Sequence, residues 1–208
     1  MRVSELSRSS GVPVATIKYY LRENLLHRGE TTSPNQARYD DTHLRRLRLV
    51  RALVEVGGLP VATVRDVLAA VDDPGVDLHS VLGRTVSAIT RDPGAADERA
   101  VGDADTDLAT ITSHTGWRVH DGAPALAGAR SVLARMHELG QAPGEDTLRA
   151  WADAADRAAE GDLLAVRRSS GREEAAETAL VGTVLGDALL ASLRRVAQES
   201  RSAQLYRG

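Results

Sequence analysis

The 208-residue sequence contains no cysteine and no phenylalanine, and aromatic residues make up only 3% of it. Without cysteine the chain cannot form disulfides, bind metal through thiolates or use a thiol nucleophile. With so few aromatic residues, the core has to be built mainly from Leu, Val and Ala, which favours helices. These absences indicate a helical protein of a reducing compartment, and we expect it to be cytoplasmic.

Long hydrophobic runs are missing as well. No uninterrupted apolar run approaches the ~20 residues that a transmembrane helix needs, and polar residues follow Met1 at once, so neither a membrane span nor a signal peptide is expected. The sequence also lacks a glycine-rich phosphate loop and a Ser/His/Asp arrangement, and we therefore expect it not to be an enzyme. The six histidines lack the compact spacing of a dedicated metal site, so no metal and no cofactor is predicted.

Charge is distributed unevenly along the chain. Residues 1–70 carry 11 Lys and Arg against 7 Asp and Glu, a net charge of +4, whereas residues 71–208 carry 15 against 22, a net charge of −7. A basic segment joined to an acidic remainder is typical of a module that faces nucleic acid attached to one that does not. Many soluble proteins share such a pattern, so the charge distribution alone does not establish nucleic-acid binding, and sequence motifs are needed.

The basic segment begins with two predicted short helices. The first covers residues 4–9 and ends at Gly11, and the second has Pro13 in its first turn. The apolar face of the second helix consists of Val14, Ile17, Tyr20 and Leu21. Its opposite face carries Ala15, Lys18, Tyr19 and Arg22. Two helices separated by a turn of about three residues are the signature of a helix-turn-helix.

A small hairpin and two more helices are expected next. Asn24 ends the second helix, and residues 27–37 are rich in Gly, Thr, Ser, Pro and Asn, which favour turns. Arg38 and Tyr39 then have the character of a second short strand, so a wing is predicted. Helices follow over residues 44–58 and 60–71, the first closed by two glycines and the second opened by Pro60.

The run VATIKYYLRENLL, from Val14 to Leu26, strongly resembles the recognition helix of the MerR family of regulators. In that family a Thr-apolar-basic-Tyr-Tyr sequence is followed by a terminated helix and a Leu-Leu strand, and the later elements agree in order and spacing over residues 1–90. One departure lies in the wing, where the family commonly has Gly-Tyr-Arg-any-Tyr and this chain has NQARY. Because successive side chains on a strand point to opposite faces, Arg38 need not have the role of the family's arginine.

The resemblance implies a homodimer that binds a pseudo-palindromic site in double-stranded promoter DNA, with recognition helices in the major groove and wings on the backbone. It also implies action on RNA polymerase through promoter distortion, which costs of order 1–6 kcal/mol. Tyrosine, arginine and lysine side chains are suited to phosphate oxygens independently of any family. The DNA-binding residues expected are Ala15, Thr16, Lys18, Tyr19, Arg22, Arg38 and Tyr39. Tyr20, on the face of Ile17, is expected in the core instead.

The predicted fold class is all-α with a two-stranded wing: a winged helix-turn-helix over residues 1–73 and a C-terminal helical bundle. A dimerisation helix is expected over residues 76–92, a linker over 93–107 and a helical effector or dimerisation domain over 108–208. The dimerisation helix has the 4-3-4 spacing of a short coiled coil at Leu78, Leu82, Thr85 and Ile89. A plain amphipathic helix packed in its own domain would show the same spacing.

The helical domain is expected to contain helices that end at Gly116, Gly140 and Gly161, and a long apolar helix over residues 173–203. It is larger than dimerisation requires and has no thiolate, so its predicted ligand is a small organic effector. Candidate effector-binding residues are His114, Trp117 and Trp151, although both tryptophans could simply pack in the core. Two other functions stay open: an effector-independent architectural or excisionase-like DNA-binding protein, and a DNA-targeted enzyme with a catalytic C-terminal domain.

Overall fold

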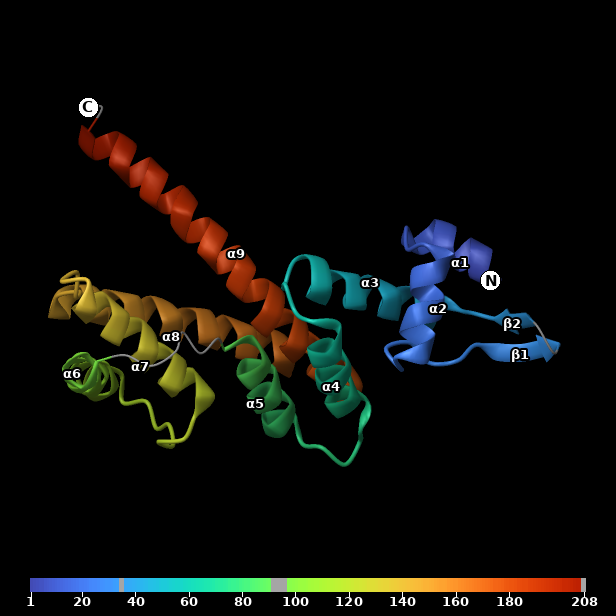
Figure 1. Ribbon diagram of the computed structural model, residues 1–208, viewed down its shortest axis with the longest axis horizontal. Coiled ribbons are helices and arrows are strands. Elements are labelled where there is room, and N and C mark those ends of the chain that lie inside the picture. The colour runs from blue at the N-terminus through green and yellow to red at the C-terminus, as the bar shows by residue number, and fades with distance from the viewer. Residues whose placement is uncertain (34–35, 91–96, 207–208) are drawn as a thin grey trace. The chain divides into compact units, whose positions relative to one another are not determined.

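The computed structural model describes residues 1–33, 36–90 and 97–206, which form nine helices and one two-stranded sheet (Figure 1). The chain divides into two compact units. The first unit contains Met1–Leu82 together with Ala176–Gly208, and the second contains Gly83–Ala175. The predicted fold class, all-α with a small wing, is confirmed.

The first unit opens with the predicted helix pair, α1 (Val3–Ser10) and α2 (Val14–Arg22). Gly11 ends α1 in the left-handed conformation, φ 69°, which glycine adopts without steric cost. Asn24 lies just beyond α2 with φ 57°, which confirms it as the end of that helix. Leu6 of α1 and Ile17 of α2 are both fully buried, so the two helices share one core.

The wing consists of β1 (Glu30–Ser33) and β2 (Gln36–Arg38), which pair antiparallel with Glu30 opposite Arg38. The N-terminus fastens the base of this hairpin. The amide of Tyr39 donates to the carbonyl of Met1 at 2.8 Å, and the Met1 amino group donates to the carbonyl of Tyr39 at 2.6 Å. The resemblance implied a strand at Leu25 and Leu26, but none forms there, and both leucines are buried core residues ahead of β1.

Helices α3 (Asp41–Glu55) and α4 (Val61–Asp72) follow the wing. Asp40 caps α3 by accepting hydrogen bonds from the backbone amides of Thr42 and His43. The inner faces of both helices are aliphatic and include Leu47, Val50, Leu53, Val64 and Leu68.

The long helix α9 (Arg172–Tyr206) returns to this first unit and was not expected there. Its buried residues are Ala176, Ala179, Leu180 and Val184. A methyl group added at Gly57, in the α3–α4 turn, would overlap Val184, so this turn and α9 are in close contact. From Leu189 to Tyr206 every residue of α9 is exposed.

By length and composition, α9 is also the one helix within the described residues that could cross a membrane. An 18-residue window has a mean hydropathy of 1.4, and 22% of that window is buried. Glu177 and Asp187 interrupt this segment, so it contains no long uninterrupted apolar run. Since Leu180 is fully buried in the first unit, α9 acts there as a core helix over its first turns.

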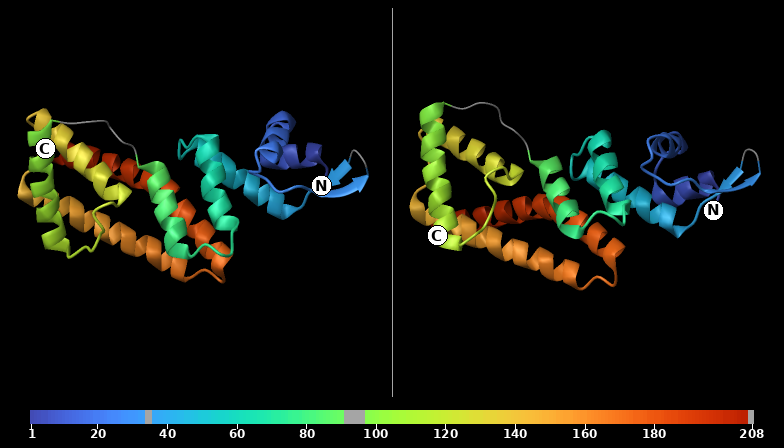
Figure 2. Two further views of the ribbon diagram at one scale, coloured as in Figure 1. Left: turned by 60° about the horizontal axis from the view of Figure 1, so that its bottom comes forward. Right: turned by 90° about the horizontal axis from the view of Figure 1, so that it is seen from below.

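The second unit is built on α6 (Glu98–Thr115), α7 (Pro124–Glu138) and α8 (Glu145–Arg167), with α6 packed against both other helices (Figure 2). Helix α5 (Leu78–Ile89) runs across the division between the units. The core of the second unit consists of Ala100, Ala104, Leu108, Leu133, Ala134 and Leu148.

Two expectations about this unit are wrong. The linker predicted for residues 93–107 is helical from Glu98, because a narrow stripe of Ala100 and Ala104 is enough to bury one face of α6. Residues 93–96 lie outside the described residues. Gly161 does not end a helix, since α8 continues to Arg167. The glycines at 116 and 140 do follow helix ends with positive φ, as expected.

Candidate functional site

Helix α2 has one face in the core and one in solvent, as its sequence predicted. Ile17 is fully buried and Tyr20 is 7% exposed, and burial raises the pKa of the Tyr20 phenol. Tyr19 is 37% exposed, and the guanidinium carbon of Arg22 lies 5.9 Å from the centre of its ring. Lys18 and Ala15 lie on the same exposed face, and Thr16 is half-buried. The exposed face of α2 therefore presents cationic and aromatic groups together, as a DNA-binding surface does.

Arg38 and Tyr39 were both expected to bind DNA, but their side chains lie in different environments. The side chain of Arg38 is exposed on β2, whereas Tyr39 is only 9% exposed and its ring packs edge-on against His43 at 5.1 Å. Tyr39 thus anchors the base of the wing and presents little of its surface to a partner.

A pocket with a volume of about 320 Å³ lies between the end of α2 and the wing. Arg22 contributes to it from α2, and Arg28 contributes from the segment that leads into β1. Arg28 was missed by the sequence analysis, although a basic residue between a recognition helix and a wing was a usable signal. The residues that line this pocket are Leu21, Arg22, Arg28, Gly29, Thr31, Ala37 and Tyr39.

Three arginines of the first unit have structural partners. The Arg46 Nε donates to the carbonyl of Leu25 at 3.0 Å, and its two terminal nitrogens bind the Asp72 carboxylate at 2.9 and 2.5 Å. Arg51 binds Glu55 and the carbonyl of Ser10, and this arginine holds the pKa of Glu55 below its usual value. Arg65 binds Glu23 at 3.1 Å.

The cationic side chains of α2 and the wing differ from these three arginines because they are not paired with acidic residues. Lys18, Arg22, Arg28 and Arg38 are all exposed and have no acidic partner within the part of the chain that the structure describes. Arg45 and Arg48, on the outer face of α3, are likewise exposed and without a salt bridge there. Unpaired cations retain their full charge for phosphate, so this set defines the candidate nucleic-acid interface.

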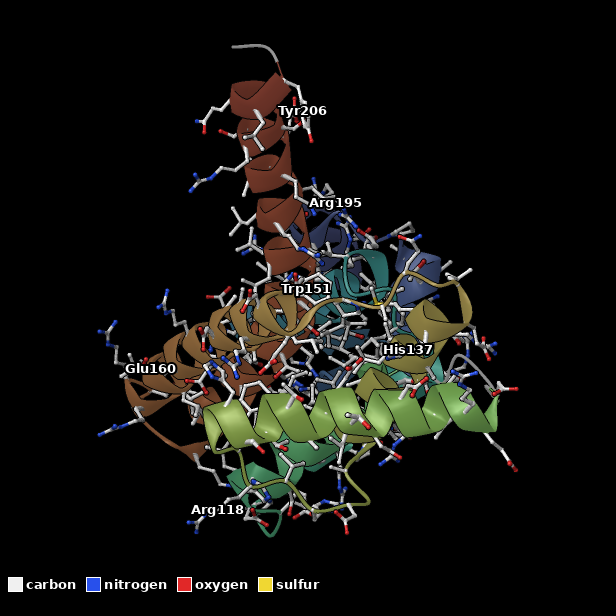
Figure 3. The ribbon with its side chains drawn as sticks, turned by 90° about the vertical axis from the view of Figure 1, so that its left-hand side faces the viewer. Arg118, His137, Trp151, Glu160, Arg195 and Tyr206 are labelled. Carbon is white, nitrogen blue, oxygen red and sulfur yellow. The ribbon has the colours of Figure 1, made fainter. Side chains whose placement is uncertain are left out.

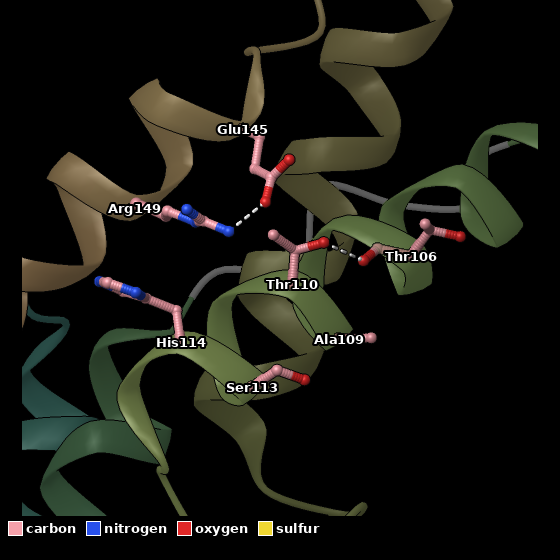
Figure 4. A pocket seen from close by; sticks show the side chains of 7 residues that line it. All are labelled: Thr106, Ala109, Thr110, Ser113, His114, Glu145 and Arg149. Carbon is pink, nitrogen blue, oxygen red and sulfur yellow. Dashed lines mark hydrogen bonds and ion pairs between the residues drawn. The ribbon is translucent and has the colours of Figure 1, made fainter.

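The second unit contains a separate, polar pocket of about 430 Å³ between α6 and α8 (Figure 4). Helix α6 contributes Thr106, Ala109, Thr110, Ser113 and His114, and α8 contributes Glu145 and Arg149. Glu145 and Arg149 form an ion pair, and the His114 Nε2 lies 2.8 Å from Asp153. Pockets of this size hold small molecules, and the polar lining favours a polar ligand.

Of the three effector-binding residues predicted, only His114 lines this pocket. The Trp117 indole nitrogen donates to Asp156 at 2.7 Å, so this side chain joins the end of α6 to α8. Trp151 lies on α8 and is 40% exposed (Figure 3).

The residues predicted for the dimer seam differ in burial. Thr85 is completely buried within the single chain, as is its neighbour Val81. Leu78, Leu82 and Ile89 are half-buried, which leaves apolar surface on one face of α5.

The first unit therefore has the architecture of a winged helix-turn-helix DNA-binding protein, with the recognition helix, wing and supporting helices in the expected order. Residues 1–71 match the family model of MerR HTH family regulatory proteins. Over almost the whole length, the chain is similar to the crystal structure of SCO5550 from Streptomyces coelicolor A3(2), described as a candidate transcriptional regulator. The two are 34% identical, the match covers 99% of this chain and 98% of that one, and the TM-score is 0.74.

The chain thus belongs to the MerR family of helix-turn-helix transcription regulators, as its recognition-helix sequence indicated. No curated protein matches it significantly.

Proposed function

We propose that the protein is a cytoplasmic homodimer that binds a pseudo-palindromic promoter site, distorts it, and so controls RNA polymerase in response to a small organic effector. Family membership supports the DNA-binding regulator. The observation that carries the location of the DNA-binding surface is a contrast between basic residues of the first unit: Arg46, Arg51 and Arg65 are paired with acidic residues, whereas those on α2 and the wing have no acidic partner among the described residues.

Each recognition surface is small. Helix α2 has only nine residues, so one copy reads a few base pairs at most, and the wing adds backbone contacts. Two copies related by a two-fold axis would double the surface and match an inverted repeat. A dimer therefore fits the size of the interface better than a monomer does.

Two apolar surfaces support the dimer. One is the half-buried face of α5, with Leu78, Leu82 and Ile89. The other is the exposed part of α9, where Leu189, Leu193 and Val196 repeat at the 4-3 spacing of a coiled-coil seam and are 59%, 53% and 64% exposed. A helix of two heptads is too short to hold two chains alone, so both surfaces are needed.

The effector site that we propose is the pocket between α6 and α8. The pocket offers hydroxyl groups, an imidazole, a guanidinium and a carboxylate, which suit a compound with several polar groups. The family assignment of the chain also supports a regulator over an enzyme.

Light scattering and DNA footprinting test the dimer together. We expect twice the chain mass at micromolar concentration and a footprint with two-fold symmetry over an inverted repeat in the protein's own or a neighbouring promoter. A monomeric mass with a one-sided footprint would overturn the two-fold model.

The effector is best tested in the full chain, because removing the C-terminal half would also remove Leu180 from the core of the first unit. A panel of small polar metabolites is screened by thermal shift against three proteins. These are the wild type, Thr110→Trp, which fills the pocket, and the control Thr147→Trp, which changes the exposed start of α8. A compound that changes the affinity for operator DNA, and whose own affinity operator DNA changes by the same factor, is the effector. If no compound binds and regulation is identical under all growth conditions, the architectural alternative is favoured.

A further inference from the structure

We propose that His27, Asp40 and His43 form a binding site for a divalent transition-metal ion at the base of the wing. His27 lies just before β1, whereas Asp40 and His43 lie just after β2, at the start of α3. The wing thus separates these residues in the sequence and brings them together in the fold. For this reason their spacing gave no sign of a site.

The three side chains already converge. One ring nitrogen of each histidine and one carboxylate oxygen of Asp40 lie within 4.8 Å of one another. The two imidazole rings are 3.8 Å apart, centre to centre, and the His43 Nδ1 lies 2.7 Å from the Asp40 Oδ1. Ligand atoms around a tetrahedral Zn²⁺ with bonds of 2.0–2.1 Å are roughly 3.4 Å apart, so a contraction of about 1.5 Å would complete the site.

Two of the ring nitrogens have hydrogen-bond partners that a metal ion bound to them would replace: the His27 Nε2 lies 3.2 Å from the Thr42 Oγ1, and the His43 Nδ1 accepts from the Asp40 amide at 3.2 Å. Imidazole nitrogens and carboxylate oxygens are both common ligands of transition-metal ions. All the hydrogen bonds that Asp40 accepts from Thr42 and His43 end on its Oδ1. The Asp40 Oδ2 can therefore bind a metal while Oδ1 continues to cap α3. The side chain of Asp40 is 68% exposed, so an ion can reach it from solvent.

Helix capping alone does not account for His43. Its position, the third of the helix, is usually Glu or Gln in a capping box, and either would serve without a buried ring. The side chain of His43 is only 5% exposed, and its Nε2 has no hydrogen-bond partner among the described residues. An unsatisfied buried nitrogen costs about 1–3 kcal/mol, so a histidine is a less favourable cap at this position than Glu or Gln. The packing of the ring against Tyr39 accounts for its bulk. A metal ion bound through the His43 Nε2 would satisfy the nitrogen that neither packing nor capping uses.

The donor set selects the metal. Two imidazoles and one carboxylate suit Zn²⁺, Ni²⁺, Co²⁺ or Cu²⁺, whereas Mg²⁺ and Ca²⁺ prefer all-oxygen sites. Three protein ligands leave a further position for water. Because the ion would join the segment entering the wing to the segment leaving it, binding would stabilise the first unit and fix the wing against α3. Nothing in this site depends on the effector pocket or on dimer formation.

Zinc titration of the metal-free full chain by calorimetry tests the site. The matched variants are His27→Gln, which removes an exposed ligand, and His79→Gln and His120→Gln, which remove exposed histidines elsewhere. We expect one Zn²⁺ per chain, at least a tenfold weaker affinity in His27→Gln, and wild-type affinity in both controls. Circular dichroism confirms that the variants are folded.

Cobalt provides a second readout. Co²⁺ bound by two histidines and a carboxylate in a tetrahedral site should give intense visible d–d absorption in the wild type, and this absorption should be lost in His27→Gln. Absence of saturable zinc binding, or zinc binding that His27→Gln leaves unchanged, would overturn the proposal. The DNA-binding proposal would be unaffected by either result, because the site lies outside the exposed face of α2.

Discussion

Arg46→Gln should destabilise the first unit, whereas Arg48→Gln, two residues further along the same helix, should not. The side chain of Arg46 is 15% exposed and donates to the carbonyl of Leu25, a fully buried residue. Losing a hydrogen bond from a charged donor costs about 1.5–3 kcal/mol. Its pair with Asp72, whose side chain is 54% exposed, adds at most about 1 kcal/mol because solvent screens it.

We therefore expect Arg46→Gln to lower the free energy of unfolding by about 2–3 kcal/mol, or Tm by roughly 4–12 °C for a chain of this size. Arg48 is exposed and has no salt bridge within the described residues, so Arg48→Gln should change stability by less than about 0.5 kcal/mol. Urea unfolding followed by circular dichroism measures both. Equal losses in the two variants, or no loss in Arg46→Gln, would refute the division into structural and free arginines.

Three further predictions follow from burial and charge. Leu180→Ala should cost about 2–5 kcal/mol because this side chain of α9 is fully buried, whereas Leu205→Ala, at an exposed position of the same helix outside the proposed seam, should cost little in thermal unfolding. Leu193→Glu should convert dimers to monomers in light scattering, and a dimer that survives this change would exclude the α9 seam. In zinc-free buffer, stability should fall as the pH is lowered from 7.5 to 5.5, and His27→Gln should reduce that slope relative to His79→Gln. The sign follows from the lowered pKa of His27: the unfolded chain takes up the proton first, so the stabilisation is present above the unfolded pKa and is lost as pH falls through the folded one.

The DNA-binding module could be predicted from the sequence because its local signals agree. The periodicity of α2 separated buried Ile17 and Tyr20 from exposed Lys18 and Tyr19, and a glycine with positive φ ended α1 where expected. Each of these features is decided within one or two turns of chain.

The failures concern contacts between segments that are distant in the sequence. Gly161, like Gly140, was expected to end a helix, but only Gly140 adopts positive φ, and α8 continues through Gly161 to Arg167. The partner of Arg46 is 26 residues away, so no local pattern distinguishes it from Arg48. The same holds for His27 and His43, which become neighbours only when the wing folds.

The central claim is that the exposed face of α2 reads DNA. One measurement tests this claim most directly. Affinity of the full chain for its operator and for a random duplex is measured by fluorescence anisotropy at several salt concentrations, for the wild type, Lys18→Ala, Arg22→Ala and the control Arg99→Ala, an exposed arginine of the second unit. A side chain that reads a base edge should lose about 1–3 kcal/mol for the operator alone, and one that binds phosphate should weaken both duplexes and lower the salt slope by about one unit. We predict one of these two outcomes at each α2 position and no change for the control. Unchanged affinity and unchanged salt slope in both α2 variants would contradict the account.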